Sequence, residues 1–394
     1  MSEIMKREDT YTANVYGKRE VVVAKGRGAL VWDVNGVEYI DCLGGHGVCV
    51  LGHSHPKIVE AITNQINKII TVPGVLYSEA RAEAAEKLVK IAPKGLTKVF
   101  FSNSGAESTE TAIKLARKYT GRKEIITMVK GFHGRTLGAL SATWKTEYRT
   151  PFEPLIPGFK FVEYGDASKV EQAVTEDTAA VIVEPIQGES GVIIPPPTYL
   201  KELREICDKK NILLIFDEVQ TGFGRTGKDF ACQHWNVTPD IMAIAKGIGG
   251  GVPVGATLAS DEIWSCMKPG DHGSTFGGNP LACAAVSAAV DVLINEKLSE
   301  KAAQTGAYMM QQLHKHLDDN KLIKEIRGLG LMIAVELKTK AKPYVVRAVE
   351  ERLLVLTSGM NILRLLPPLV ITREQVEQVA ERLNRVIQPL KSVD

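Results

Sequence analysis

Short apolar runs alternate with segments of helical period along the first 250 residues of the chain. The runs are rich in Val, Ile, Leu and Phe and are too short for helices, which is typical of buried parallel strands. We predict such strands at residues 98–101, 125–129, 180–184, 212–217 and 241–245. Between them, residues 79–91 and 199–209 place apolar side chains on one stripe of a helix. This alternation predicts an α/β fold with a parallel sheet covered by helices.

The last third of the chain has a different pattern. Helical periodicity at residues 281–295 and 300–318 is followed by an apolar run at 331–337 and by a final predicted helix at 373–390. Because strands and helices no longer alternate regularly here, we predict a smaller α+β domain at residues 281–394.

The first fifty residues also resemble strands, at 21–23 and 30–34, separated by turn residues. We expect residues 1–50 to form an N-terminal segment that packs with the small domain. Residues 51–280 then form the large domain.

Composition narrows the class of protein. The 394 residues are 44% hydrophobic and 24% charged, as in globular domains, which argues against disordered and fibrous proteins. The 48 basic and 46 acidic side chains nearly cancel, so the charge indicates neither a nucleic-acid nor a membrane partner. We find no signal peptide or membrane-spanning run and expect a cytoplasmic protein.

Metal and disulfide chemistry find little support in the sequence. The six cysteines are scattered and form no C-x-x-C pair, so neither a zinc site nor a disulfide framework is expected. His53 and His55 have the spacing of a metal pair, but no third ligand cluster accompanies them, and we expect no metal.

A glycine-rich segment, residues 222–227, fits the G-x-G-x-x-G pattern of dinucleotide-binding loops. In such loops the first glycine directly follows the strand and a helix opens at the last. Here four polar residues lie between the strand and the first glycine: Asp217, Glu218, Gln220 and Thr221. No amphipathic helix pattern begins at Gly227, so the context argues against a nicotinamide cofactor.

Three candidate site residues stand just after predicted strands. Loss of hydration at Lys246 would lower the pKa of its amine toward the neutral nucleophile that imine chemistry needs. Asp217 ends a strand, where ligands of open α/β sheets bind. Ser104 precedes a predicted helix, whose N-terminal amides can hold a phosphate. Taken singly, each residue has an ordinary explanation: a surface lysine, an aspartate that accepts hydrogen bonds from loop amides, and a helix cap. Taken together, the three residues describe a pyridoxal phosphate site.

At these positions the chain resembles the class III pyridoxal-phosphate aminotransferases, the ornithine and acetylornithine type, over almost its whole length. The resemblance implies fold type I, with a mainly parallel seven-stranded sheet in the large domain and a small α+β domain from both termini. The motifs that carry it occur at residues 104–107, 132–135, 184–189, 216–222, 246–247 and 272–280.

The resemblance also assigns the reacting groups. Lys246 would bind pyridoxal phosphate as an imine and then shuttle the substrate proton. Asp217 would pair with the pyridine nitrogen, which keeps the ring protonated and makes it a deeper electron sink.

Further residues are implied to bind the cofactor. Ser104, Gly105 and Ala106 would hold the phosphate. Phe132 would stack on the pyridine ring, and Gln220 would lie near the ring oxygen. Thr275 of the neighbouring subunit would complete the phosphate site, so the resemblance implies a homodimer with shared active sites.

Substrate recognition is implied for two arginines and one glutamate. A guanidinium matches a carboxylate through two parallel hydrogen bonds. Arg135 would take one carboxylate of the amino acid, and Arg364 would take the α-carboxylate of glutamate. Glu189 would pair with Arg364 when an ω-amine donor brings an apolar arm, so that no buried charge stays unpaired.

Segments 39–45, 143–152 and 363–368 look most like the lysine-biosynthesis branch, which acts on lysine linked to a small acidic amino-group carrier protein. We therefore expect transfer of the terminal amine of N-acetylornithine, or of carrier-linked lysine, to 2-oxoglutarate. The alternatives are another ω-aminotransferase acting on ornithine or 4-aminobutyrate, an amino-acid racemase of the same family, and a cofactor-binding regulatory protein without activity.

Overall fold

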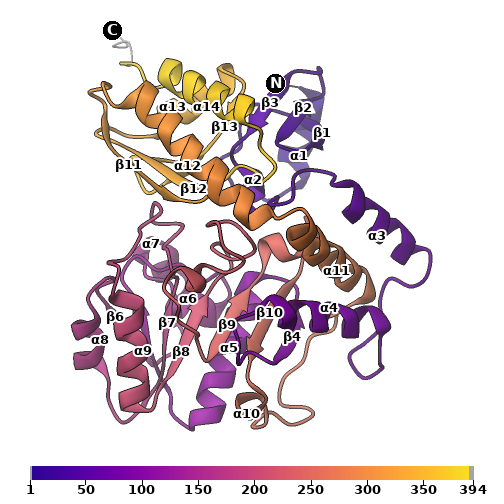
Figure 1. Cartoon of the computed structure of the whole chain (residues 1–394), viewed down its shortest axis with the longest axis vertical. Helices are drawn as coiled ribbons and strands as arrows, with labels where there is room; N and C mark the ends of the chain where they lie inside the picture. The colour runs from indigo at the N-terminus through magenta and orange to yellow at the C-terminus, as the bar shows by residue number, and fades with distance from the viewer. Residues whose placement is uncertain (1, 390–394) are drawn as a thin grey trace.

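A seven-stranded sheet forms the lower part of the molecule in Figure 1. The computed structural model describes residues 2–389. The strands lie side by side in the order β4 (Lys98–Ser102), β10 (Gly255–Ala259), β9 (Ile241–Ile244), β8 (Leu213–Asp217), β7 (Thr178–Val183), β5 (Glu124–Met128) and β6 (Phe159–Val162). Only β10 runs against its neighbours in this sheet. The predicted α/β fold with a mainly parallel sheet is therefore confirmed.

Five of these strands coincide with the predicted apolar runs, because β7, β8 and β9 are buried along their whole length and are therefore mostly apolar. The sequence analysis missed two strands. Strand β10 has the sequence GATLA, whose small residues give little apolar signal. Strand β6 lies at the sheet edge and includes Lys160.

Helices and short turns connect and cover these strands. They are α4 (Glu79–Ile91), α5 (Gly105–Thr120), α6 (Leu137–Ala142), α7 (Thr146–Arg149), α8 (Ala167–Ala173), α9 (Tyr199–Lys210), α10 (Asp261–Trp264), and the 3₁₀ turns η1 (Thr150–Phe152), η2 (Ala231–His234) and η3 (Lys246–Gly249). Helix α4 has the predicted bounds, with the Ser78 side chain capping its first turn.

Two smaller sheets make up the upper part of the molecule (Figure 1). One is antiparallel, in the order β11 (Ile323–Leu329), β12 (Met332–Leu337), β15 (Ile362–Leu365) and β14 (Leu356–Ser358). The other contains β1 (Val23–Arg27), β2 (Leu30–Asp33), β3 (Glu38–Asp41) and β13 (Leu353–Leu354). Strand β13 pairs in parallel with β3, so the N-terminal strands share a sheet with a strand from the C-terminal part.

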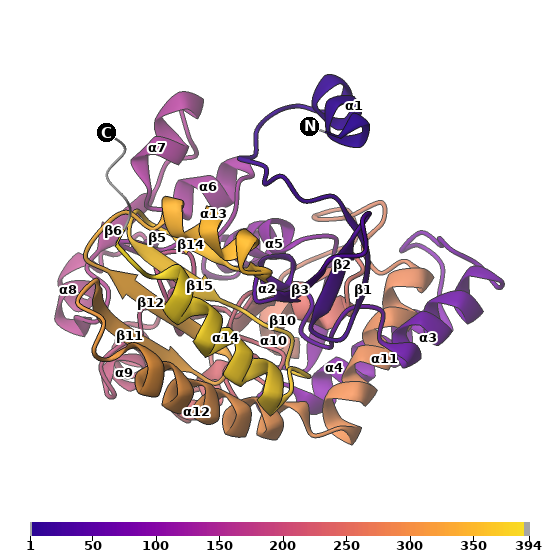
Figure 2. The same cartoon turned by 90° about the horizontal axis from the view of Figure 1, so that it is seen from above.

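The remaining helices are α1 (Glu3–Tyr11), α2 (Gly44–Gly47), α3 (Pro56–Ile66), α11 (Pro280–Asn295), α12 (Leu298–Leu317), α13 (Lys342–Glu350) and α14 (Arg373–Val386). In the view from above, α1 stands apart from the body, and none of its residues is buried (Figure 2). Among residues 2–389, none of the helices combines the length and the apolar character that a membrane crossing needs. The division into segments 1–50, 51–280 and 281–394 stays a prediction.

Two predicted boundaries were wrong. The final helix ends at Val386 rather than at residue 390, which lies outside the described residues. Pro389 cannot continue a helix, which is consistent with the earlier end. The first strand covers Val23–Arg27 rather than 21–23, because its exposed polar residues give no apolar run.

Candidate active site

A cavity of about 610 Å³ lies at the carboxyl end of the large sheet. Parallel strands end at the same edge, so residues far apart in sequence meet there. Asp217 is the last residue of β8, Lys246 follows β9, and Ser104 follows β4. Eight of the predicted site residues line this cavity: Ser104, Gly105, Ala106, Phe132, Arg135, Asp217, Gln220 and Lys246.

The start of α5 forms one wall of the cavity. The Ser104 hydroxyl accepts a hydrogen bond from the backbone N–H of Glu107 at 3.2 Å, which fixes the first turn. Gly105 has no room for a side chain, because a Cβ there would lie 2.6 Å from Val219. The first N–H groups of a helix lack intrahelical partners, so this wall offers amide donors to an anion.

Lys246 begins the turn η3 with φ of 52°, in the left-handed region that non-glycine residues rarely adopt. Its side chain lines the cavity and is partly buried. Burial lowers the pKa of the ammonium, and the nearby Glu189 carboxylate opposes that shift. A lysine with a lowered pKa has more of the neutral amine, which is the nucleophilic form.

Asp217 and His133 contribute a buried carboxylate and a buried imidazole to the cavity lining. Asp217 Oδ2 lies 2.8 Å from Nδ1 of His133, whose side chain is fully buried. The other oxygen, Oδ1, accepts the backbone N–H of Val219 at 3.0 Å. Two partners therefore fix the carboxylate at the strand end. The sequence analysis gave His133 no role, although it belongs to the Phe-His-Gly-Arg motif.

A second buried carboxylate, Glu184, joins two segments of the site. It accepts the backbone N–H of Phe132 at 3.0 Å and that of Gly188 at 3.1 Å. Burial raises the pKa of Glu184 to about 7, and the His133 and Asp217 charges act on it in opposite directions. Glu184 was not predicted as a site residue, although it ends a predicted buried strand and opens the motif at residues 184–189.

Arg364 approaches the site from the C-terminal sheet. It lies on β15 and is fully buried. Its guanidinium donates to the Glu189 carboxylate at 2.8 Å and to Oε1 of the Gln220 side chain at 3.2 Å. Gln220 also donates to Glu189 at 3.4 Å. Burial opposes ionisation of Glu189, but the Arg364 guanidinium prevails and lowers the pKa of that carboxyl.

Arg135 lies at the exposed mouth of the cavity. Its guanidinium carbon is 3.6 Å from the ring centroid of Tyr148 and 5.8 Å from that of Phe132. A second cavity of about 320 Å³ lies next to it, and its lining includes Phe132, Trp144, Tyr148 and Glu189. Stacking on Tyr148 orients a planar cation, a contact that no sequence pattern indicated.

Thr275 is the predicted site residue that lies away from the cavity. It is exposed and does not line the cavity of Lys246. The chain therefore brings together the other predicted residues, either around the cavity or in the Arg364 cluster next to it.

The rejected motifs have structural roles instead. No helix opens at Gly227, and a Cβ there would lie 2.9 Å from Ala303. His53 pairs with Asp41 at 2.7 Å and His55 with Glu296 at 3.3 Å, so the two histidines face different carboxylates.

Comparison with known proteins gives matches over nearly the whole chain. The family model for aminotransferase class-III matches residues 11–387. Acetylornithine aminotransferase of Methanopyrus kandleri is 52% identical, over 95% of this chain and 96% of its own. [LysW]-aminoadipate semialdehyde transaminase of Deinococcus radiodurans is 47% identical, over 98% and 90%.

A solved structure of ornithine aminotransferase from Toxoplasma gondii has a TM-score of 0.93 to this chain and is 36% identical, over 98% of this chain and 93% of its own. It is described as having partial occupancy of pyridoxal phosphate (PLP) at the active site.

The cavity of this chain fits such a group. The amides at the start of α5 suit a phosphate. Asp217 offers a buried carboxylate to a ring nitrogen, and Lys246 offers a partly desolvated amine to an aldehyde.

Proposed function

The chain belongs to the class III aminotransferases, and we propose that it exchanges the terminal amine of an N-blocked diamino acid with 2-oxoglutarate. Enzymes of this family use PLP, and the wider class of ω-aminotransferase follows from the relatives. The pair of Arg364 and Glu189 carries the proposal, because it serves a site that takes a diacid and an amine in turn.

Arg364 is the element of this pair that recognises glutamate. A fully buried guanidinium strongly favours a carboxylate partner. In the described structure Glu189 supplies one from within the chain. A dicarboxylate such as glutamate or 2-oxoglutarate would displace Glu189 and bind Arg364 in two parallel contacts. An amine donor with an apolar arm leaves Glu189 in place. In both cases the positive charge of Arg364 is therefore neutralised, by the substrate carboxylate or by Glu189.

PLP, when bound, supplies an electron-withdrawing ring that stabilises the negative charge left after a carbon next to the amine loses a proton. Asp217, oriented by His133 and by the Val219 N–H, would hold a proton on the ring nitrogen. Nζ of Lys246 would remove the proton from the carbon that carries the amine and return it at the carbon on the other side of the transferred nitrogen. Ser104 with the α5 amides would anchor the phosphate.

We also propose a homodimer with shared active sites. Apolar side chains are exposed on one continuous stretch that joins α3 to α4, together with an aromatic ring beside Thr275: Ile69, Ile70, Val75, Leu76, Tyr77 and Phe276. Large exposed apolar patches mark protein interfaces. Burial of this patch against a second copy would bring Thr275 to the partner's cofactor phosphate. The predicted cytoplasmic location stays a prediction.

The blocked amine donor is N-acetylornithine or lysine linked to an acidic carrier protein. The second cavity, beside Glu189 and Arg135, offers room of about 320 Å³ for a group attached to the α-amine. The relatives act on substrates of both kinds, according to their names.

The test follows the absorption of the bound cofactor while glutamate, N-acetylornithine or carrier-linked lysine is added at matched concentration. Conversion to the amine form by glutamate and by one blocked donor is expected, and the faster donor identifies the pathway. Arg364→Lys serves as the matched variant, which should lose the response to glutamate and keep that to the amine donor. Absence of conversion by any donor contradicts the proposal, and deuterium uptake at Cα without an oxoacid would indicate a racemase.

A further inference from the structure

The loop that carries Glu189 follows β7 and is held against the C-terminal sheet. Its base is closed by a bridge between Gln187 and Ile193, with backbone hydrogen bonds in both directions. At its tip, Gly191 has φ of 106°, and a Cβ there would lie 2.2 Å from Ile362 of β15. Because β15 also carries Arg364, the loop lies directly on the strand of its ionic partner.

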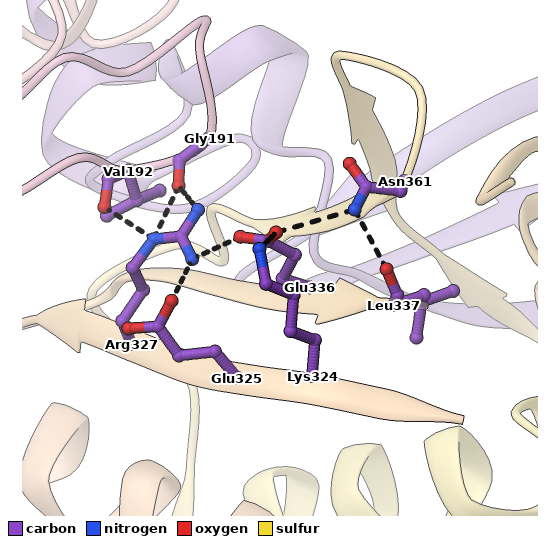
Figure 3. A network of polar contacts seen from close by, with 8 residues as sticks. All are labelled: Gly191, Val192, Lys324, Glu325, Arg327, Glu336, Leu337 and Asn361. Carbon is purple, nitrogen blue, oxygen red and sulfur yellow. Dashed lines mark hydrogen bonds and ion pairs between the residues drawn. The ribbon is translucent and has the colours of Figure 1, made fainter. Parts of the chain in front are cut away.

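Arg327, on β11, is the side chain that ties this loop down. Its Nε donates to the carbonyl oxygens of Gly191 at 3.0 Å and Val192 at 3.1 Å, and its Nη2 donates to Gly191 at 2.6 Å. Figure 3 shows the guanidinium between these two loop carbonyls and a group of carboxylates. Ser358, on β14, adds a second anchor by donating its hydroxyl to the backbone carbonyl of Glu189.

The carboxylates fix the direction of Arg327. Its Nη1 lies 2.6 Å from Glu336 and 2.6 Å from Glu325 (Figure 3). The side chains of Arg327 and Glu336 are only 16% and 13% exposed, so this pair is screened less than a surface pair. Lys324 reaches the same Glu336 at 2.6 Å but has no hydrogen bond or ion pair to the loop among the described residues.

We propose that Arg327 is a positioning residue that sets how strongly Glu189 covers Arg364, and thereby sets the enzyme's preference between diacid and amine donors. This inference rests on the proposed function. Arg327 lines neither cavity, and its hydrogen bonds to the loop go to backbone carbonyls only, so it acts through the position of Glu189. A loop that is already ordered forms the ion pair without a further cost in conformational entropy.

A loosened loop changes the two donors in opposite directions. Arg327→Lys keeps the charge beside Glu336 but replaces the planar fork by a single ammonium, which cannot hold both carbonyls in the same geometry. Glu189 then covers Arg364 less well, so a diacid meets less competition. An amine donor meets a buried guanidinium that is less well neutralised.

The test measures the affinity of glutarate, a diacid without a reactive amine, for the holoenzyme by calorimetry, together with KM and kcat for glutamate. The proteins are the wild type, Arg327→Lys, Glu189→Gln, the double variant and the matched control Lys324→Met. For Glu189→Gln we expect glutarate to bind about 10-fold tighter, and for Arg327→Lys about 3-fold tighter, with kcat within about 2-fold. In the Glu189→Gln background, Arg327→Lys should change nothing.

The double variant separates positioning from a general structural effect. An equal effect of Arg327→Lys in both backgrounds, no effect in the wild-type background, or the same effect from Lys324→Met overturns the inference. If Arg327→Lys fails to fold, Ser358→Ala is used instead, because it removes the other anchor of the loop. The same change in glutarate affinity is then expected, and the same results overturn the inference. Unchanged glutarate affinity in Arg364→Lys contradicts the proposed function itself, and the inference falls with it. If Arg364→Lys loses glutarate affinity but Arg327→Lys leaves it unchanged, the inference is refuted and the proposed function stands.

Discussion

Two pairs of side chains stand at this active site, and they are built differently. The Asp217–His133 pair comes entirely from the large sheet and its loops, and both side chains are buried. The Arg364–Glu189 pair joins the C-terminal sheet to a loop of the large one, and the Glu189 side chain is 32% exposed. The first pair has a fixed frame, whereas the second depends on how two parts of the molecule meet.

This difference suits two tasks: the first pair would serve the chemical step, and the second would select between the two substrates. In the proposed function Asp217 keeps a ring nitrogen protonated and must not move, and an imidazole and a backbone amide hold it in place. The Glu189 carboxylate, by contrast, must leave Arg364 for one substrate and return for the other, so its side chain must be able to swing. We call Asp217 and His133 the fixed pair, and Arg364 and Glu189 the hinged pair. Substitutions in the fixed pair should therefore slow every donor, and those in the hinged pair should redistribute activity between donors.

The largest effect is expected at the fixed side. Lys246→Ala removes the amine that, in the proposed function, forms the covalent link and moves the proton, so turnover with every donor should fall by roughly 1000-fold or more. Single-turnover kinetics with glutamate and with N-acetylornithine measure it. Lys228→Ala, a lysine outside the cavity lining, is the control. If Lys246→Ala keeps activity with one donor only, the fixed side of the site also selects the donor, and the distinction between the two pairs fails.

The next effect is expected at His133. His133→Asn removes an imidazole partner of Asp217, so kcat should fall by about 10- to 100-fold for both donors while their KM values change little. Steady-state kinetics with the two donors check this, and a pH titration of the cofactor absorption reports the ring proton. A change confined to one donor would place His133 with the hinged pair instead.

A smaller and opposite pair of effects is expected at Glu189. Glu189→Gln keeps the size but removes the charge, so KM for glutamate should fall by about 3-fold and KM for the amine donor should rise by about 10-fold. Initial rates at varied donor concentration measure both. Glu205→Gln, at an exposed position of α9 that lines neither cavity, is the matched control. A parallel shift in both KM values would remove the distinction between the two pairs.

The smallest effect concerns Glu184 and pH. Burial raises the folded pKa of Glu184 to about 7, above its ordinary value of 4.5, so the folded state binds this proton more tightly than the unfolded state does. The stability that this provides is present below about pH 4.5 and is lost as the pH rises to 7 and above. Relative to Glu184→Gln, which stays neutral, the wild-type Tm should therefore fall by about 2–4 °C between pH 5 and 8.

Differential scanning calorimetry of both holoenzymes across that range checks the prediction. A Tm difference that does not vary with pH would mean that Glu184 stays ionised in the folded protein. The fixed region would then tolerate a second buried charge beside Asp217.

Sequence reasoning found the parts of the site that follow buried strands. Lys246 and Asp217 end or follow continuous apolar runs, and Ser104 opens a helix, so local patterns place them at one sheet edge. It missed Glu184 and Arg327, because their roles come from contacts with backbone groups on other elements. Such contacts leave no periodic signal. Strand β10 escaped for a different reason, since its sequence GATLA gives little apolar signal although every residue is buried.

The pairing of β3 with β13 has a consequence for synthesis of the protein on the ribosome. The edge of β3 finds its partner strand more than 300 residues later in the chain. At about 5–20 residues per second, roughly 15 to 60 s pass before Leu353 and Leu354 emerge. Throughout that interval Ile40 and the open strand edge face the cellular milieu and are a target for chaperones. The nascent chain therefore completes its N-terminal sheet near the end of translation.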